Sequence, residues 1–367
     1  MGNLILQGNS TEYPGFSLLG EPTLVITMDE VGTVLFSFDL LDFLVLKGTT
    51  SVTVASTGAI NGTNELPQLA EKNNVLTTVT INGAEDLKLG SFTTGHANSG
   101  DAVVTDIAAT AASPTTIHSS LTLINASATP AGGVEIFAGA TNTSGAGNFA
   151  NGASLNANVT ITYTGLTIKG GSGNDAIEND AKNGIVTDGD GNDSVVLGGA
   201  GAKAILGTGA DRVFVGISDL GTNETAGSAV GDKVTFGAAA TSKLGVGTGA
   251  EAGSTINNAI IGLTKVVKAA DGMVIDFSTF GVTTSHFIAD ETTVVASATT
   301  LKAAENAAVN AFGSSGVAYF SFKGNEYFIA TNSAEAAVSS NDAIVELVGV
   351  TDIHHASNNF GLVTLHV

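Results

Sequence analysis

Three glycine-rich loops, each ending in an aspartate, recur along the chain at a constant interval of eighteen residues. Each has the pattern Gly-x-Gly-x-Asp, at positions 171–175, 189–193 and 207–211. Aspartate carboxylates and the backbone carbonyls that glycines leave open are oxygen donors, and Ca²⁺ takes about six to eight such oxygens. The residue types and their spacing therefore predict sites for a hard divalent cation.

The constant interval also predicts how the loops are arranged. Ile177, Val195 and Val213 follow two positions after the three aspartates, which completes the repeat pattern of a calcium-binding parallel β-roll. If nine residues make one loop and one short strand, eighteen residues make one full coil, and residues eighteen apart lie above one another. The aspartates then form a column, and the three apolar side chains point into a narrow core.

A column of carboxylates is unstable without a cation. Stacked strands would place Asp175, Asp193 and Asp211 roughly 5 Å apart, and each adjacent pair repels by about 3 kcal/mol at an effective dielectric constant near 20. A divalent ion between successive loops changes this repulsion into attraction, so we expect metal binding and folding to be one event. The candidate metal-binding residues are Gly171, Gly173, Asp175, Gly189, Asp190, Gly191, Asp193, Gly207, Gly209 and Asp211.

The opposite edge of the expected roll is less regular. The loop at 199–203 keeps its glycines but ends in Lys203, and the segment 179–184 keeps neither the glycines nor the acid in register. We therefore expect the aspartate edge to bind ions and the Lys203 edge to bind them weakly or not at all, with a salt bridge of Lys203 as an alternative to an ion. Three more aspartates are candidate additional ligands: Asp188, Asp232 and Asp276.

Residues 168–215 resemble the repeats-in-toxin nonapeptide array of proteins exported by type I secretion. The segments 231–236, 271–281 and 319–350 resemble the tail of Gram-negative surface-layer proteins of that group. The resemblance implies a secreted, calcium-dependent subunit that forms a two-dimensional lattice with copies of itself at the cell surface. It also implies an uncleaved C-terminal signal for the type I secretion machinery. The lysine at 203 and the short array depart from the pattern and leave the number of ions open.

The composition excludes several classes of partner. The chain has 13 basic and 34 acidic residues, a net charge of −21, and no basic patch, so nucleic-acid binding is not expected. It has no cysteine, which excludes disulfides and thiolate metal sites. The apolar run Val31–Leu46 is too short and too acidic, with Asp39 and Asp42, to insert in a membrane. No secretory signal is recognisable at the N-terminus, which fits a C-terminal signal or a chain that begins inside a longer protein.

The sequence indicates no catalytic centre, and we expect the protein not to be an enzyme. It contains no His-Glu-x-x-His motif, no Gly-x-Ser-x-Gly elbow and no phosphate-binding Gly-Lys-Ser/Thr loop. We interpret His354 and His355 as part of a surface loop. The acidic pair Glu85 and Asp86 is better explained as a solvated turn than as a glycosidase pair.

Short segments with alternating apolar and polar residues, separated by Gly, Asn and Ser, predict an all-β fold. We expect a parallel β-helix, or β-solenoid, that continues into the calcium β-roll and ends in a small β-rich cap with one helix. In the cap we predict a helix over 299–312, and a hairpin of strands 317–322 and 326–331. The expected regions are an N-terminal β segment over 1–50, a β-solenoid over 51–168, the roll over 169–216, and the cap with the secretion-signal region over 217–367.

Two functional classes remain open. In the first, the chain is a structural subunit of a bacterial surface layer that folds and assembles outside the cell when it binds Ca²⁺. In the second, it is a secreted adhesin or a solenoid polysaccharide-processing enzyme that uses the roll as its export module. An aromatic content of 6% without tryptophan weighs against sugar processing. Cell-surface polysaccharide remains a candidate partner in either class.

Overall fold

The computed structural model of the 367-residue chain consists mainly of β-strands, with two short helices among the residues that it describes. The all-β prediction is confirmed, and most strand pairs are parallel. None of the helices that are described is long and apolar enough to span a membrane. The described residues are 2–7, 16–19, 23–29, 44–57, 63–66, 69–71, 75–89, 103–105, 115–129, 133–138, 159–215, 233–235, 243–246, 263–269, 271–277, 289–312, 316–331, 337–338, 342–351, 353, 357–359 and 362–366.

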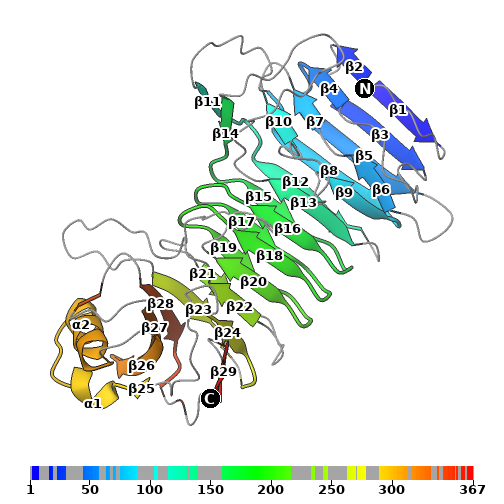
Figure 1. The fold of residues 1–367 in the computed structure, drawn as a ribbon. Coiled ribbons are helices and arrows are strands. Elements are labelled where there is room, and N and C mark those ends of the chain that lie inside the picture. The colour runs from blue at the N-terminus through cyan, green and yellow to red at the C-terminus, as the bar shows by residue number, and fades with distance from the viewer. Residues whose placement is uncertain are drawn as a thin grey trace. The chain divides into compact units, whose positions relative to one another are not determined.

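The chain divides into two compact units. The first comprises Met1–Asp193 with Asp219–Asn223, and the second comprises Ser194–Ser218 with Glu224–Val367. In the first unit, one sheet has seven strands in the order β1-β3-β5-β8-β12-β15-β17, all parallel (Figure 1). Their bounds are β1 Gly2–Gln7, β3 Thr23–Asp29, β5 Ser51–Thr57, β8 Thr78–Gly83, β12 Leu123–Ala128, β15 Thr167–Lys169 and β17 Ile185–Thr187.

Three further groups of parallel strands complete the first unit. They run in the orders β6-β9-β13-β16, β2-β4-β7-β10 and β11-β14. Their bounds are β6 Thr63–Leu66, β9 Asp86–Leu89, β13 Val134–Ala138, β16 Ala176–Asn179, β2 Phe16–Leu19, β4 Leu44–Lys47, β7 Leu69–Glu71, β10 Val103–Thr105, β11 Thr115–His118 and β14 Val159–Thr162.

The core of the first unit is built from side chains that stack from strand to strand. Val52, Val79, Ile124, Ile168 and Val186 occupy equivalent positions on five consecutive strands, and all are fully buried. β-branched residues suit a pleated surface, and neighbouring strands lie about 4.8 Å apart, so these side chains contact one another along the whole row. The intervening residues of these strands are less buried, as the alternation in the sequence predicts.

The second unit contains two groups of strands and both helices. The first group runs in the order β19-β21-β23-β28-β27-β26-β25 and becomes antiparallel at β28, β27 and β26; the second runs in the order β18-β20-β22-β24-β30-β29. Their bounds are β18 Ser194–Leu197, β19 Lys203–Ile205, β20 Arg212–Val215, β21 Lys233–Thr235, β22 Lys243–Val246, β23 Leu263–Val267, β24 Val274–Asp276, β25 Ala289–Asp290, β26 Gly316–Phe322, β27 Asn325–Thr331, β28 Ala343–Val348, β29 Ser357–Asn359 and β30 Leu362–Thr364.

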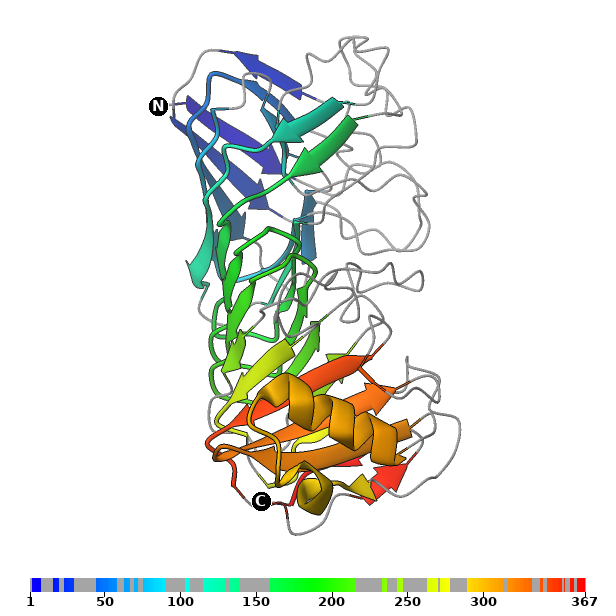
Figure 2. The same cartoon turned by 90° about the vertical axis from the view of Figure 1, so that its left-hand side faces the viewer.

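The two helices are α1 Thr292–Val295 and α2 Leu301–Phe312, and α2 packs on β26 and β27 (Figure 2). The predicted helix and hairpin are both confirmed, with α2 beginning two residues later than the predicted range. The sequence did not predict α1, because four residues are too few to establish a helical period. Most of the apolar run 31–46 lies outside the described residues.

Candidate metal centre

The first two glycine loops lie directly against one another, as the eighteen-residue interval predicts. The Asp190 N–H donates to the Gly171 carbonyl oxygen at 3.1 Å. The Asp175 N–H donates to Asp193 Oδ1 at 2.7 Å, across the same interval. The Asn192 N–H donates to Asn174 Oδ1 at 2.8 Å, again across eighteen residues. Loops 171–175 and 189–193 are therefore held in register by hydrogen bonds that need no ion.

Glycine is required where these two loops touch. A Cβ atom on Gly189 would lie 1.8 Å from the Gly171 carbonyl oxygen, and one on Gly191 would lie 2.2 Å from the Gly173 carbonyl oxygen. Both Gly189 and Gly191 also have positive φ, +104° and +143°, a backbone conformation that other residues adopt only with strain. In the third loop, Gly209 has the same φ of +143° as Gly191. These three loop glycines thus adopt a conformation that favours glycine over other residues.

Asp175 ties its own loop to the neighbouring strand. Its Oδ2 accepts the Gly171 N–H at 2.8 Å and its Oδ1 accepts the Val134 N–H at 2.9 Å. Burial raises the pKa of Asp175 to about 6, the two backbone hydrogen bonds oppose this rise, and the charge of Asp86 adds to it. Both carboxylate oxygens are thus engaged with backbone amides, which is the geometry of a structural cap.

A different set of three aspartates comes together at the loops. Asp188, Asp193 and Asp211 are all buried, and each has a carboxylate oxygen within 4.8 Å of the other two. Asp188 follows β17, while Asp193 and Asp211 immediately precede β18 and β20. Two of the predicted column residues therefore belong to the cluster. Asp175 does not, and Asp188, predicted only as an additional ligand, takes the third position.

The eighteen-residue repeat does not predict Asp188 as a main ligand, for a reason visible in the sequence. Eighteen residues before it stands Gly170, and eighteen after it stands Leu206, so Asp188 breaks the repeat. Its position is nevertheless informative, because it lies immediately before the glycine that begins the second loop. An acid placed there points toward the same turn as the aspartate that ends the loop.

The chemistry of the cluster fits a hard divalent cation. Three buried carboxylates this close repel by about 3 kcal/mol per ionised pair at an effective dielectric constant near 20, and burial removes the water that would screen them. The donors are all oxygens, which Ca²⁺ and Mg²⁺ prefer, whereas Zn²⁺ favours nitrogen and sulfur ligands. Asp188, Asp193 and Asp211 are the residues that would hold the ion.

The other candidate ligands lie elsewhere or outside the described residues. Asp190 is exposed and Asp276 is partly buried, and neither belongs to an acidic cluster within the described part of the chain. Asp232, together with His354 and His355, falls outside that part. The apolar residues that follow the three loops, Ile177, Val195 and Val213, are all fully buried, as the repeat pattern predicts.

On the opposite edge, an amide closes the turn at 179–184. Asn179 is fully buried, its Nδ2 donates to the Leu166 carbonyl oxygen at 3.0 Å, and its Oδ1 accepts the Ala181 N–H at 3.1 Å. A Cβ atom on Gly184 would lie 2.9 Å from this amide. Lys203 is exposed. Hydrogen bonds supplied by Asn179 therefore do at this turn what an ion would do at the aspartate edge.

In the acidic pair Glu85 and Asp86, the side chain of Asp86 links two strands. Asp86 is exposed and its Oδ1 accepts the Gly133 N–H at 2.9 Å, which ties the start of β9 to the residue before β13. This is the same type of link that Asp175 makes to Val134. Aspartates at strand starts thus recur as caps for the backbone of an adjacent strand.

Comparison of the chain with models of known protein families gave no match, and comparison with curated proteins gave none either.

Proposed function

We propose that the parallel strands form a β-solenoid whose glycine loops make a calcium β-roll, and that the protein folds fully only when this roll binds Ca²⁺. The buried cluster of Asp188, Asp193 and Asp211 is the observation that carries the proposal. It combines three negative charges with oxygen-only donors on loops whose glycines permit close stacking. The eighteen-residue interval and the hydrogen-bonded register of the first two loops support the coil geometry.

The proposed role of calcium is to make folding depend on location. Where calcium is scarce, as in a bacterial cytoplasm, repulsion within the cluster keeps the roll from completing its fold, which suits passage through a narrow export channel. Extracellular calcium sites have dissociation constants of about 10⁻⁴ to 10⁻³ M, so millimolar calcium outside the cell drives folding by mass action.

We further propose that the folded chain is a structural subunit of a bacterial surface layer, secreted through type I machinery and assembled with copies of itself. This step rests on the resemblance of 168–215 to the repeats-in-toxin array and of the C-terminal segments to surface-layer tails. The chain's acidic character supports assembly through shared calcium ions, because a net charge of −21 opposes close approach of copies without them.

The test combines a calcium count with electron microscopy. Mass spectrometry under native conditions, or calcium analysis after gel filtration, should find bound calcium in the purified chain, and less of it in the double variant D188N/D193N. Negative-stain images should show ordered sheets in millimolar Ca²⁺ and dispersed particles in chelator. A chain that binds no calcium refutes the metal centre. A chain that binds calcium but stays monodisperse refutes the lattice alone and favours the adhesin or enzyme alternative.

A further inference from the structure

Helix α2 carries an acidic residue at the centre of its buried face. The apolar stripe of α2 includes Leu301 and Val309, and Glu305 lies four residues from each of them. Residues four apart lie on one face of a helix, so Glu305 points in the same direction as this stripe. Its exposed fraction is 1%. Glutamate is almost never buried to this degree unless it is paired.

The surroundings of Glu305 are almost entirely apolar. Ala304, Ala308 and Val309 of α2 form one apolar cluster with residues of α1 and the sheet: Val295, Ala318, Phe320, Tyr327, Ile329 and Ile344. Within the described part of the chain, Oε1 of Glu305 is buried and has no hydrogen-bond partner. An ionised carboxylate in such a place costs several kcal/mol, whereas a protonated carboxyl costs much less. The geometry therefore favours the neutral form.

The charged groups around this face do not supply a counter-charge. Lys302, on the same helix, is exposed, and its charge lowers the pKa of Glu305 less than burial raises it. Glu291, which precedes α1, is acidic and so adds no compensation. On β26 the cluster residues are Ala318 and Phe320, which do not titrate.

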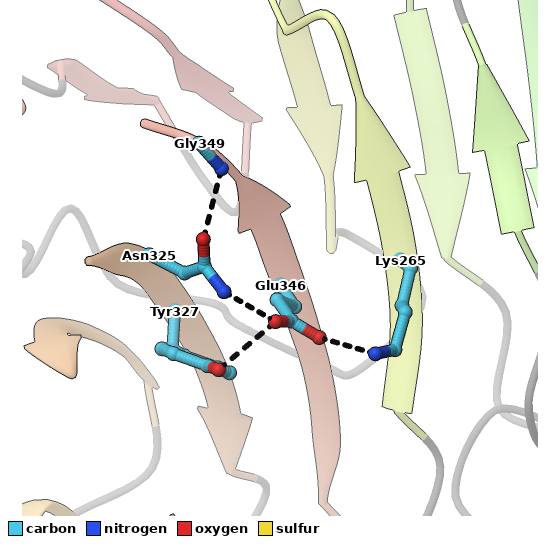
Figure 3. A network of polar contacts seen from close by, with 5 residues as sticks. All are labelled: Lys265, Asn325, Tyr327, Glu346 and Gly349. Carbon is cyan, nitrogen blue, oxygen red and sulfur yellow. Dashed lines mark hydrogen bonds and ion pairs between the residues drawn. The ribbon is translucent and has the colours of Figure 1, made fainter. Parts of the chain in front are cut away.

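On β27 and β28, Tyr327 and Glu346 belong to one network of polar contacts (Figure 3). Glu346 accepts hydrogen bonds from Tyr327 Oη at 3.0 Å and Asn325 Nδ2 at 2.7 Å, and it pairs with Lys265 at 3.2 Å. The charge of Glu346 is thus compensated by Lys265 on β23. The pKa of Tyr327 is raised to about 12, first by burial and then by Glu346 and Glu305 together, so this phenol stays neutral.

We propose that Glu305 makes the docking of α2 on β26 and β27 depend on pH, so that the helix packs with its carboxyl protonated and is released when the carboxyl ionises. This inference is independent of the calcium proposal. Release would uncover the apolar face that includes Phe320 and Ile329.

The sign and size of the effect follow from the burial of the group. Burial raises the pKa of Glu305 from its usual 4.5 to about 7. Since the docked helix holds the proton more tightly than the released one, docking is strongest below pH 4.5, weakens between pH 4.5 and 7, and stays weak above pH 7. Each pKa unit is a factor of ten in the equilibrium, so the full change is about 300-fold.

Hydrogen exchange of peptides from 301–312, corrected for the pH dependence of intrinsic exchange, tests the proposal in the full chain at constant calcium. Wild-type protection in α2 should fall by up to about 300-fold between pH 4.5 and pH 8. The variant E305Q, which has the same shape but cannot ionise, should keep a constant protection over this range. The control A303E adds a carboxyl at an exposed position of the same helix, and its protection should fall as in the wild type.

A second measurement protects the test against a variant that does not fold. Carbon-13 NMR of glutamate carboxyls in the wild type should show Glu305 titrating near pH 7, well above the exposed glutamates. A Glu305 that titrates near 4.5, or α2 protection that does not change with pH in the wild type, overturns the proposal. An E305Q variant that folds and still loses protection as the pH rises overturns it as well.

Discussion

Neutralising one aspartate of the buried cluster should stabilise the calcium-free protein and lower its affinity for calcium. In Asp193→Asn, the shape is kept and the amide oxygen can still accept the Asp175 N–H. The charge that is lost belongs to two of the three carboxylate pairs in the cluster with Asp188 and Asp211. The same substitution therefore removes repulsion when no ion is bound and removes an ion ligand when one is.

The magnitude can be worked from the separation of the oxygens. The oxygens lie within 4.8 Å of one another, so at an effective dielectric constant near 20 each ionised pair repels by about 3 kcal/mol or more, and two unrelaxed pairs by about 6 kcal/mol or more. Protonating one carboxyl would also relieve the repulsion, but at pH 8 this costs about 5.6 kcal/mol for a carboxyl of ordinary pKa. Because side chains relax, we expect the variant to be about 2 to 4 kcal/mol more stable than the wild type in chelator.

Urea denaturation at pH 8, followed by circular dichroism in EDTA and across a calcium titration, measures both effects. The advantage of the variant should shrink as calcium rises, by about 1.4 kcal/mol or more at saturation, because losing an anionic ligand should weaken calcium binding at least tenfold. Asp175→Asn is the matched control, since this carboxylate caps two backbone amides and lies outside the cluster. It should lose about 1 to 3 kcal/mol in both conditions.

The proposed metal centre is refuted if Asp193→Asn is less stable than the wild type in chelator by the same amount as in calcium. That outcome would mean that the carboxylate acts only as a hydrogen-bond acceptor, as Asp175 does, and that the cluster holds no ion. The metal centre would also be refuted if the calcium titrations of variant and wild type coincide.

Three further predictions test the parts around the cluster. Asp211→Asn should weaken calcium binding about as much as Asp193→Asn, because both carboxylates belong to the same cluster, and calcium titration followed by calorimetry compares the two. Gly189→Ala should lower the free energy of unfolding by several kcal/mol because its Cβ would lie 1.8 Å from a carbonyl oxygen, whereas Gly324→Ala, with open space around its Cβ, should lose only about 1 to 2 kcal/mol. Asn179→Ala should lose about 2 to 3 kcal/mol equally in calcium and in chelator, measured by urea denaturation, since it removes buried hydrogen bonds and no ion ligand.

The strands were largely predictable because their apolar residues alternate. The β-prone sequence segments 51–55, 87–89, 134–137 and 158–163 coincide with β5, β9, β13 and β14 within a few residues. The similar segment 120–125 forms a strand only from Leu123 onward. The cause is a local one: the Ser120 hydroxyl donates to the Leu76 carbonyl oxygen, so this residue binds the neighbouring chain segment through its side chain.

The positions of residues that interrupt a sequence pattern were harder to predict. Asp188 has no counterpart at the repeat interval, so the repeat does not identify it as a main ligand. Its place immediately before Gly189 does indicate that it belongs to the second loop. Glu305 interrupts the apolar stripe of α2, and a charged residue is normally expected on the solvent side of a helix. Its spacing of four from both Leu301 and Val309 would have placed it on the buried face.

If the proposed roll binds calcium, the hydrogen bonds between the loops predict that the ion would not stabilise all three loops equally. Loops 171–175 and 189–193 are joined through backbone amides and through Asp193, and Asp175 has two amide donors of its own. These links do not require a cation, whereas the charge of Asp211 adds repulsion to the cluster that a cation would relieve. Removing calcium should therefore raise hydrogen exchange in 207–211 first and in 171–175 last. Uniform loss of protection across the three loops would instead mean that the ion is needed for every turn, as the repeat alone had suggested.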